Sequence, residues 1–245
     1  METAGNCRNC NAALSGKFCN ECGQSADTHK VDFHYLWHDL QHAAFHFDKG
    51  FLYTARQMLT RPGHSVREFL EGKRANHFRP LSFLLILAGV HSFLFVYLHI
   101  SVMDISGVKN GPDTVHATVS NWVSSHYAIS LILFLPLTTL ATYFAFWKKG
   151  YNFAECLVLN TFLSGQQLIL SLAFFPLYIY LGGTQYVRLA SMFFSVSGFI
   201  LTFWTYSQFF NTLKLWESAL RTLVYYIILG VLSLGVIMVV TLFIR

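Results

Sequence analysis

Long apolar blocks, separated by short polar segments, dominate the chain after residue 80. Within each block the apolar residues do not alternate with polar ones, and each block is long enough to cross a hydrocarbon core about 30 Å thick. We therefore expect five membrane spans, at residues 81–100, 127–147, 153–181, 189–210 and 222–244. A split or re-entrant element near Pro176 and Gly182-Gly183 would change this number and the side of the C-terminus.

The segment before the first span contains short amphipathic pieces instead of long apolar runs. Arg61-Pro62-Gly63 divides it, because proline lacks an amide donor and restricts the residue before it. We expect one helix before this break. A second helix is expected to begin at Ser65, an N-cap with a glutamate three residues later, and to stop at Gly72. Pro80 suits the first turn of the first span.

These patterns predict an all-α polytopic membrane protein with about five transmembrane helices. Interfacial amphipathic helices and a small N-terminal zinc ribbon precede the spans. The expected domains are a ribbon at residues 1–26, a His-rich and basic juxtamembrane segment at residues 27–80, and a helical transmembrane domain at residues 81–245.

Composition supports a membrane protein and indicates its orientation. The chain is 54% hydrophobic and only 12% charged, about half the charge of a soluble domain. Residues 1–80 hold ten of the 17 Lys and Arg residues. With a cytoplasmic N-terminus, the inner loops add Lys148, Lys149, Lys214 and Arg221, and the outer side holds Lys109, Arg188 and Arg245.

This bias follows the positive-inside rule. It predicts a multi-pass protein of the bacterial cytoplasmic (inner) membrane with its N-terminus inside and its C-terminus outside. The same bias explains the sequence pI near 9.0, so we expect no nucleic-acid partner.

Two CxxC pairs, Cys7/Cys10 and Cys19/Cys22, stand eight residues apart near the N-terminus. The N-terminus has no apolar signal-peptide region, so these cysteines are expected to be reduced. Two such knuckles can close a tetrahedral shell of four thiolates around Zn²⁺, in a structural role because no ligand position stays open. An iron site of the rubredoxin type uses the same ligands, and spacing does not distinguish it. A redox dithiol is the weaker alternative.

Four histidines follow at intervals of four residues, which places them along one stripe of a helix. A second metal site is a candidate here, formed by His38, His42, His46 and Asp48. The alternative is an amphipathic helix at the membrane surface, with the histidines along its edge.

Basic side chains continue up to the first span and are candidates to bind lipid headgroups. They are Arg56, Arg61, Arg67, Lys73, Arg74 and Arg79.

Spaced residues in the same region resemble a known family. They are Phe47-Asp48-Lys49-Gly50, Thr54, Leu59, Arg61-Pro62-Gly63, Arg67-Glu68-Phe69-Leu70, Gly72-Lys73-Arg74 and Phe78-x-Pro80. This pattern, over about residues 38–88, resembles DUF3667, a family of bacterial membrane proteins of unknown function whose members often carry an N-terminal CxxC ribbon. The resemblance implies a membrane setting. It implies no reaction, ligand or catalytic residue.

Uncharged polar residues occur inside the expected spans, where they are the usual place to look for function. A polar cavity is one interpretation, lined by His91, Asn160, Gln167 and Ser171. Hydrogen bonding between packed helices is the alternative. No acidic or basic residue lies deep in any expected span. Ion-coupled transporters usually need such a residue, so the sequence argues against that class.

Three hypotheses about function follow, and no catalytic signature such as a P-loop or HExxH motif favours an enzyme. The first is a non-enzymatic adaptor or assembly factor, whose cytoplasmic ribbon binds a protein partner while the basic segment contacts membrane lipid. The second is a small-solute transporter or channel that uses the polar intramembrane face. The third is a metal-dependent enzyme at the membrane interface that acts on lipid. Self-association into a homo-oligomer is compatible with each.

Overall fold

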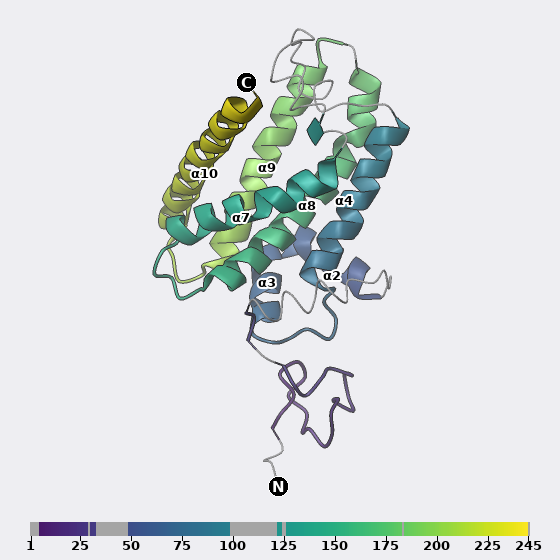
Figure 1. Cartoon of the computed structure of the whole chain (residues 1–245). Helices are drawn as coiled ribbons and strands as arrows, with labels where there is room; N and C mark the ends of the chain where they lie inside the picture. Colours follow the sequence, from purple (N-terminus) through teal and green to yellow (C-terminus); the bar gives the residue numbers. More distant parts are fainter. Residues whose placement is uncertain are drawn as a thin grey trace.

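The computed structural model describes residues 5–28, 30–32, 49–98, 122–123, 126–182 and 184–244 (Figure 1). Within these residues it contains seven helices and two isolated β-bridges, which confirms the all-α prediction. The helices are α2 (Lys49–Thr60), α3 (Pro62–Leu70), α4 (Pro80–Tyr97), α7 (Tyr127–Ala145), α8 (Phe153–Leu181), α9 (Val187–Phe209) and α10 (Leu215–Ile244).

Five of these helices, α4, α7, α8, α9 and α10, are long and apolar enough to cross a membrane, as predicted. Pro176 lies inside the continuous helix α8, so α8 is not split there. Helix α10 begins at Leu215, earlier than the expected span, because the preceding polar residues join the same helix. The cysteine-rich ribbon lies at one end of the molecule, and the C-terminal end of α10 lies at the other (Figure 1).

Helix α8 is the centre of the packing, since it contacts α4, α7 and α9 as well as α2 and α3. A glycine makes the closest of these contacts possible. A Cβ atom added to Gly165 would lie 2.6 Å from the Phe83 ring of α4. The N-terminus of α8 is held by a capping box, in which Asn152 and Glu155 exchange hydrogen bonds with each other's backbone.

Helices α2 and α3 form a bent pair that packs against α8 and α9 at the ribbon end. The predicted break is confirmed: α2 ends at Thr60, and α3 begins with Pro62 in its first turn. Met58 of α2 and Val66 and Phe69 of α3 are buried in the same core cluster as residues of α4 and α8. The pair is therefore part of the folded core.

Two local predictions for this pair had different outcomes. Gly72 does stop α3, with a positive φ of 103° that favours glycine. The prediction that Ser65 caps α3 was wrong, because the helix already starts at Pro62. Arg61 occupies the N-cap position, and its side chain makes no capping hydrogen bond to the first turn of α3. Ser65 is instead fully buried on the inner face of the helix.

Candidate metal centre and its docking to the membrane helices

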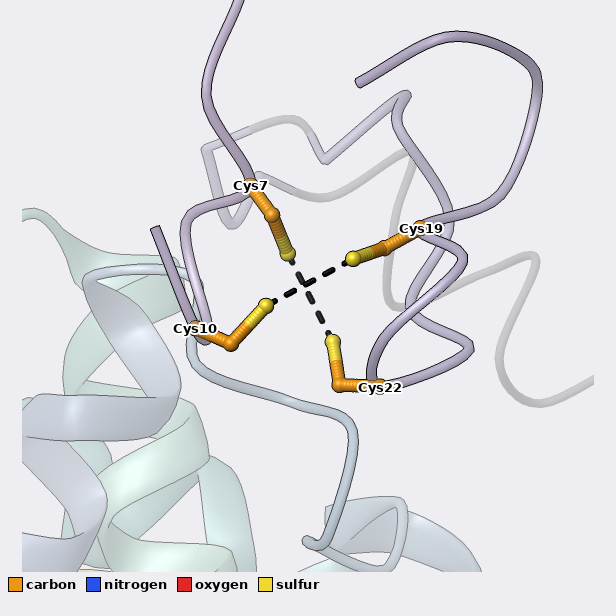
Figure 2. Close-up of side chains that lie close together, drawn as sticks. All are labelled: Cys7, Cys10, Cys19 and Cys22. Atoms are coloured by element: carbon orange, nitrogen blue, oxygen red, sulfur yellow. Dashed lines mark hydrogen bonds between the residues drawn. The ribbon is translucent and has the colours of Figure 1, made fainter. Parts of the chain in front are cut away.

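The four predicted cysteine ligands converge on one point (Figure 2). Their sulfur atoms all lie within 4.8 Å of one another. The Sγ atoms of Cys7 and Cys22 are 3.6 Å apart, and those of Cys10 and Cys19 are 3.5 Å apart. A tetrahedral Zn²⁺ with Zn–S bonds of about 2.3 Å requires sulfur separations of about 3.8 Å. The geometry therefore fits a tetrahedral metal ion, and the four sulfurs would fill its shell.

The two knuckles that present these sulfurs repeat the same backbone pattern twelve residues apart. In the first, the Cys7 N–H donates to the Ala12 carbonyl; in the second, the Cys19 N–H donates to the Gln24 carbonyl, each at 2.8 Å. The residue after the second cysteine of each pair has a positive φ, 62° at Asn11 and 73° at Gly23. Asparagine and glycine are the residues that adopt this conformation most readily.

The knuckle backbone also prepares the first cysteine to act as a ligand. A hydrogen bond from the backbone of Cys10 lowers the pKa of the Cys7 thiol to about 7, against the opposing effect of burial. Metals bind the thiolate, not the thiol. The backbone of the first knuckle therefore favours the ionised form at Cys7. At Cys10, a backbone hydrogen bond from Ala12 is outweighed by hydrogen bonds with the other cysteine sulfurs and by burial, which raise its pKa to about 12.

Gln24, which directly follows the second knuckle, docks the ribbon onto the loop between α3 and α4. Its side-chain amide donates to the Gly72 carbonyl at 2.8 Å. Its side-chain oxygen accepts from the backbone N–H groups of Arg74 at 2.8 Å and Ala75 at 3.0 Å. Gln24 and Gly72 are buried, so the bond between them satisfies a backbone carbonyl that water does not reach. The two bonds from Arg74 and Ala75 lie at the edge of the contact, because Arg74 is half-buried and Ala75 is exposed.

Neighbouring contacts extend this docking surface. A Cβ atom on Gly72 would lie 2.8 Å from the Arg8 side chain of the first knuckle. Val31 is fully buried in the core cluster that includes α2, α3 and α8. Lys30 forms an ion pair with Glu155 at 3.5 Å, although the lysine side chain is 73% exposed and the pair is worth little by itself.

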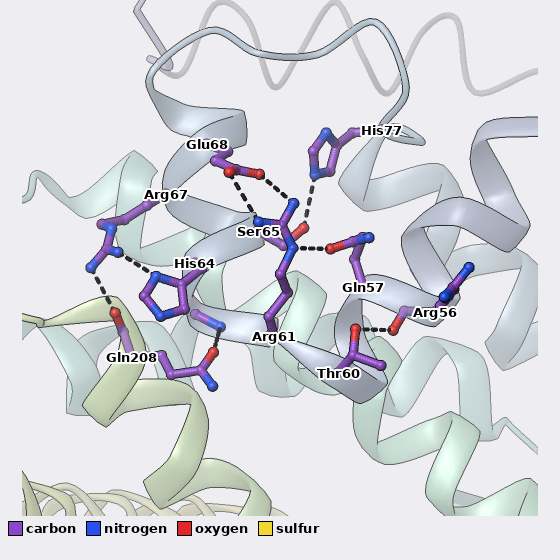
Figure 3. Close-up of polar contacts among 11 residues, drawn as sticks. Arg56, Gln57, Thr60, Arg61, His64, Ser65, Arg67, Glu68, His77 and Gln208 are labelled. Carbon is purple, nitrogen blue, oxygen red and sulfur yellow. Dashed lines mark hydrogen bonds and ion pairs between the residues drawn. The ribbon is translucent and has the colours of Figure 1, made fainter.

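The Arg61-Pro62-Gly63 break places α3 directly against the last turn of α9 (Figure 3). A Cβ atom on Gly63 would lie 2.4 Å from both the Phe209 backbone nitrogen and the Thr205 carbonyl oxygen. The Gly63 N–H donates to the side-chain oxygen of Gln208 at 3.1 Å. Only glycine allows the two backbones to approach this closely.

Two of the six arginine and lysine residues predicted to bind lipid headgroups make extensive contacts inside the protein (Figure 3). Arg67 donates to the carbonyls of Gln208 at 2.6 Å and Phe209 at 3.1 Å, and so caps the C-terminus of α9. Arg61 forms a two-point pair with Glu68 at 3.0 and 3.2 Å and also hydrogen-bonds Gln57.

Of the other four members of that predicted set, one is half-buried and three are exposed. Arg74 is half-buried, with its guanidinium 5.1 Å from the centre of the Phe69 ring and a hydrogen bond to the Phe69 carbonyl. Arg56, Lys73 and Arg79 are exposed. Lipid binding by the set remains a prediction that now depends mainly on these exposed members.

Ser65 and His77 form a pair with the spacing of a nucleophile and its base. Ser65 Oγ lies 2.8 Å from His77 Nε2, and burial lowers the pKa of His77 below its usual value. Ser65, however, has no exposed surface. The pair therefore joins α3 to the loop before α4, and a substrate could not reach the hydroxyl.

The four residues predicted to line one polar cavity are divided among three contacts between helices. His91 Nε2 lies 2.8 Å from Ser171 Oγ, and the His91 ring stacks on Tyr127. Gln167 donates to Thr202, which also accepts from Tyr226.

The third contact surrounds Asn160, which hydrogen-bonds Thr142 and Tyr206. All three contacts join different spans through uncharged polar groups. Hydrogen bonds of this kind are common where helices pack in membranes.

Three glutamines that the sequence did not single out carry important contacts. Gln166 donates to the Met58 carbonyl in the last turn of α2 at 2.7 Å and accepts from Thr205 of α9 at 2.9 Å. Gln24 and Gln208 have the roles given above. For Gln24, the sequence did contain one signal of its role, because it stands immediately after a CxxC-Gly turn. The proposed second metal site, His38, His42, His46 and Asp48, lies outside the described residues.

Residues 48–91 match the model of a family described as a protein of unknown function (DUF3667). No curated protein and no solved structure was found to match the chain. The matched region contains the helix break, the Gly72 turn that receives the ribbon, and α4 as far as His91. Over this segment, which packs against α8 and α9, the chain is similar to the DUF3667 family.

Proposed function

We propose that this protein is a non-enzymatic adaptor of the bacterial cytoplasmic membrane. Its ribbon, folded around a structural Zn²⁺, presents a binding surface to a cytoplasmic protein partner. The observation that carries the proposal is the closed shell of four cysteine sulfurs, which leaves no ligand position for water or substrate. A site of this kind stabilises a surface and does not perform chemistry on a ligand.

The ribbon offers an exposed apolar residue for such a partner. Phe18, just before the second knuckle, exposes 63% of its surface although it lies on a small polar module. Large aromatic residues of this kind are common anchors at protein interfaces. The Gln24 contacts hold the ribbon against the membrane helices, so a partner bound at Phe18 would be held at a defined place beside the membrane.

The distribution of charge supports a cytoplasmic ribbon. Lys148 and Lys149 follow α7, and Lys214 precedes α10, at the same end of the helices as α2 and α3. Arg188 lies at the opposite end, in the first turn of α9. Basic residues gather on the cytoplasmic side of membrane proteins. We therefore place the N-terminus inside and the end of α10 outside.

Site-specific photocrosslinking in intact cells tests the adaptor function. A photoreactive amino acid replaces Glu21, an exposed ribbon residue that is not a metal ligand. We expect a crosslinked protein that is lost when Phe18→Ser is introduced and when Cys19→Ser and Cys22→Ser are combined. Leu52→Ser is the matched control, because Leu52 is 68% exposed and lies on α2, outside the ribbon.

Two measurements accompany this experiment. Protein abundance and bound zinc are determined for each variant, and the Phe18→Ser protein is expected to keep both. A reporter that is active only outside the cytoplasm, fused after residue 245, is expected to be active. Crosslinks that persist in both ribbon variants at normal abundance would contradict the adaptor function, and an inactive C-terminal reporter would contradict the orientation.

A further inference from the structure

At the ribbon end of the bundle the C-terminus of α7 meets the first turns of α10 (Figure 1). A groove lies at this contact. It has a volume of about 410 Å³ and is lined by Ala145, Trp216, Glu217, Leu220, Arg221 and Val224. Its size is within the range of small-molecule sites. Most of its lining surface comes from apolar side chains on one face of α10.

Arg221 supplies the cationic group in this groove. Its Nη1 atom donates to the Ala145 carbonyl at 2.7 Å. Ala145 is the last residue of α7, where backbone carbonyls lack partners within the helix. This hydrogen bond fixes the guanidinium at the mouth of the groove and uses one of its five N–H donors.

Three lysines lie close in sequence to the residues that line the groove. Lys148 and Lys149 follow the end of α7 by three and four residues, and Lys214 immediately precedes α10. Lys148 and Lys214 are exposed, and Lys149 is half-buried. Within the lining, the charge of Glu217 balances that of Arg221, so the positive excess in this region comes from the three lysines.

Aromatic side chains place this groove at the level of the lipid headgroups. Trp216 and Trp147 are 64% and 47% exposed and lie at the start of α10 and just beyond the end of α7. Trp147 also stacks with Phe144. Tryptophan is enriched where a span meets the membrane surface. From Leu220 and Val224 onward, the exposed face of α10 continues as apolar residues.

We propose that this groove is a binding site for one anionic phospholipid of the leaflet on the ribbon side. The headgroup phosphate contacts Arg221 and is attracted by Lys148, Lys149 and Lys214. The acyl chains lie along the apolar face of α10 beyond Leu220 and Val224. A zwitterionic lipid would fill the same apolar surface but would lose most of the attraction of the lysines.

Photoactivatable lipids test the site in the full-length protein. The protein is reconstituted in phosphatidylcholine nanodiscs that contain one of two photoactivatable lipids. One is phosphatidylglycerol and the other is phosphatidylcholine, and each carries a diazirine in its acyl chain. Labelled residues are mapped by peptide mass spectrometry. We expect labelling of α10 at residues 224–239, along its exposed apolar face, that is stronger with phosphatidylglycerol. Phosphatidylglycerol without the diazirine should compete this labelling away.

Variants of the lysines test headgroup recognition without disturbing the fold. Unlike Arg221, whose side chain caps the end of α7, the lysine side chains do not cap this helix. Two variants are compared, Lys214→Gln and the double variant Lys148→Gln with Lys149→Gln. In each, the affinity of the competing phosphatidylglycerol is expected to fall roughly fivefold for each charge removed. Arg221→Gln removes the cap as well, so its thermal stability is measured alongside. Arg188→Gln, at the opposite end of the bundle, is the control and should leave the labelling unchanged.

Three results would overturn the proposal. They are equal labelling by the two lipids, labelling at α10 that the lysine variants leave unchanged, and an equal loss of labelling in Arg188→Gln. None of these results bears on zinc or crosslinking at the ribbon, so this proposal and the adaptor function fail independently.

Discussion

The side-chain amide of Gln24 donates a hydrogen bond to the backbone carbonyl of Gly72 at 2.8 Å, across 48 residues of sequence. This contact joins the second cysteine knuckle to the turn that ends α3. Because α3 in turn packs against α9, the four-cysteine cluster and the membrane helices are parts of one structure. The ribbon is therefore positioned by the DUF3667 segment, and its position depends on a few identifiable groups.

Replacing Gln24 should release the ribbon without removing its metal. Gln24→Ala leaves the Gly72 carbonyl and the Arg74 and Ala75 N–H groups without their partner. Of these groups the Gly72 carbonyl is buried, and a buried group left without a partner costs about 1–3 kcal/mol. We expect faster hydrogen exchange in residues 5–32 and 71–79, measured by mass spectrometry, with zinc content unchanged.

Asn20→Ala is the matched control for Gln24→Ala. Asn20 is an exposed ribbon residue that bonds only to Ser15 among the hydrogen bonds of the described residues. Its removal should leave exchange in residues 71–79 at the native rate. Native exchange in the Gln24→Ala protein would show that docking does not depend on this side chain.

Gly63 should be among the least tolerant positions in the protein. Gly63→Ala places a methyl group 2.4 Å from two backbone atoms of α9, which cannot move as a side-chain tip does. Overpacking of this kind costs about 1–3 kcal/mol or more. We expect a clear fall in the melting temperature in detergent. Gly89→Ala, which meets no atom within 4 Å, should not lower it, and equal melting of the two variants would contradict the predicted contact.

Arg67 should contribute more to stability than Arg61, although both have hydrogen-bonded guanidinium groups. Arg67→Met leaves two carbonyls at the end of α9 without their charged donor, a loss of about 1.5–3 kcal/mol. The Arg61–Glu68 side chains are 43% and 26% exposed, so Arg61→Met should cost less than about 1 kcal/mol. Thermal unfolding of both variants in the same nanodiscs gives the comparison, and the reverse order would refute it.

Protonation of His77 should destabilise the protein as the pH falls. Burial lowers the pKa of His77 in the folded state, whereas the unfolded value is about 6.5. The unfolded state therefore binds more protons between these two values. The contribution of His77 is complete above pH of about 6.5 and is lost as the pH falls through its folded pKa.

Melting temperatures measured between pH 7.5 and pH 5 test this dependence. The wild-type protein should lose more stability over this range than His77→Gln, which has no titrating group at this position. Glu68 and Arg61 act on His77 in opposite directions and are present in both proteins. Parallel pH profiles for the two would show that His77 does not titrate in this way.

The membrane spans and the cysteine centre could be predicted because each depends on local sequence. A span needs only a sufficient length of apolar residues, and the five expected spans correspond to α4, α7, α8, α9 and α10. A thiolate shell needs only two short CxxC turns that meet, and the four cysteine sulfurs do meet. The Pro62 break and the Gly72 stop were likewise predictable, because both follow from the backbone of single residues.

Tertiary structure alone decided what Arg67 and Gly63 contact. In sequence, Arg67 was equivalent to the exposed Arg56 and Lys73 as a candidate for lipid, but its partners lie at the end of α9, 141 and 142 residues away. The Gly63–Gln208 contact likewise spans 145 residues, whereas Arg61 pairs locally with Gln57 and Glu68. The C-terminus of a helix attracts a cation that packs beside it. Sequence by itself therefore determined the spans and the four-cysteine cluster, and the packing of α3 against α9 determined the partners of Arg67.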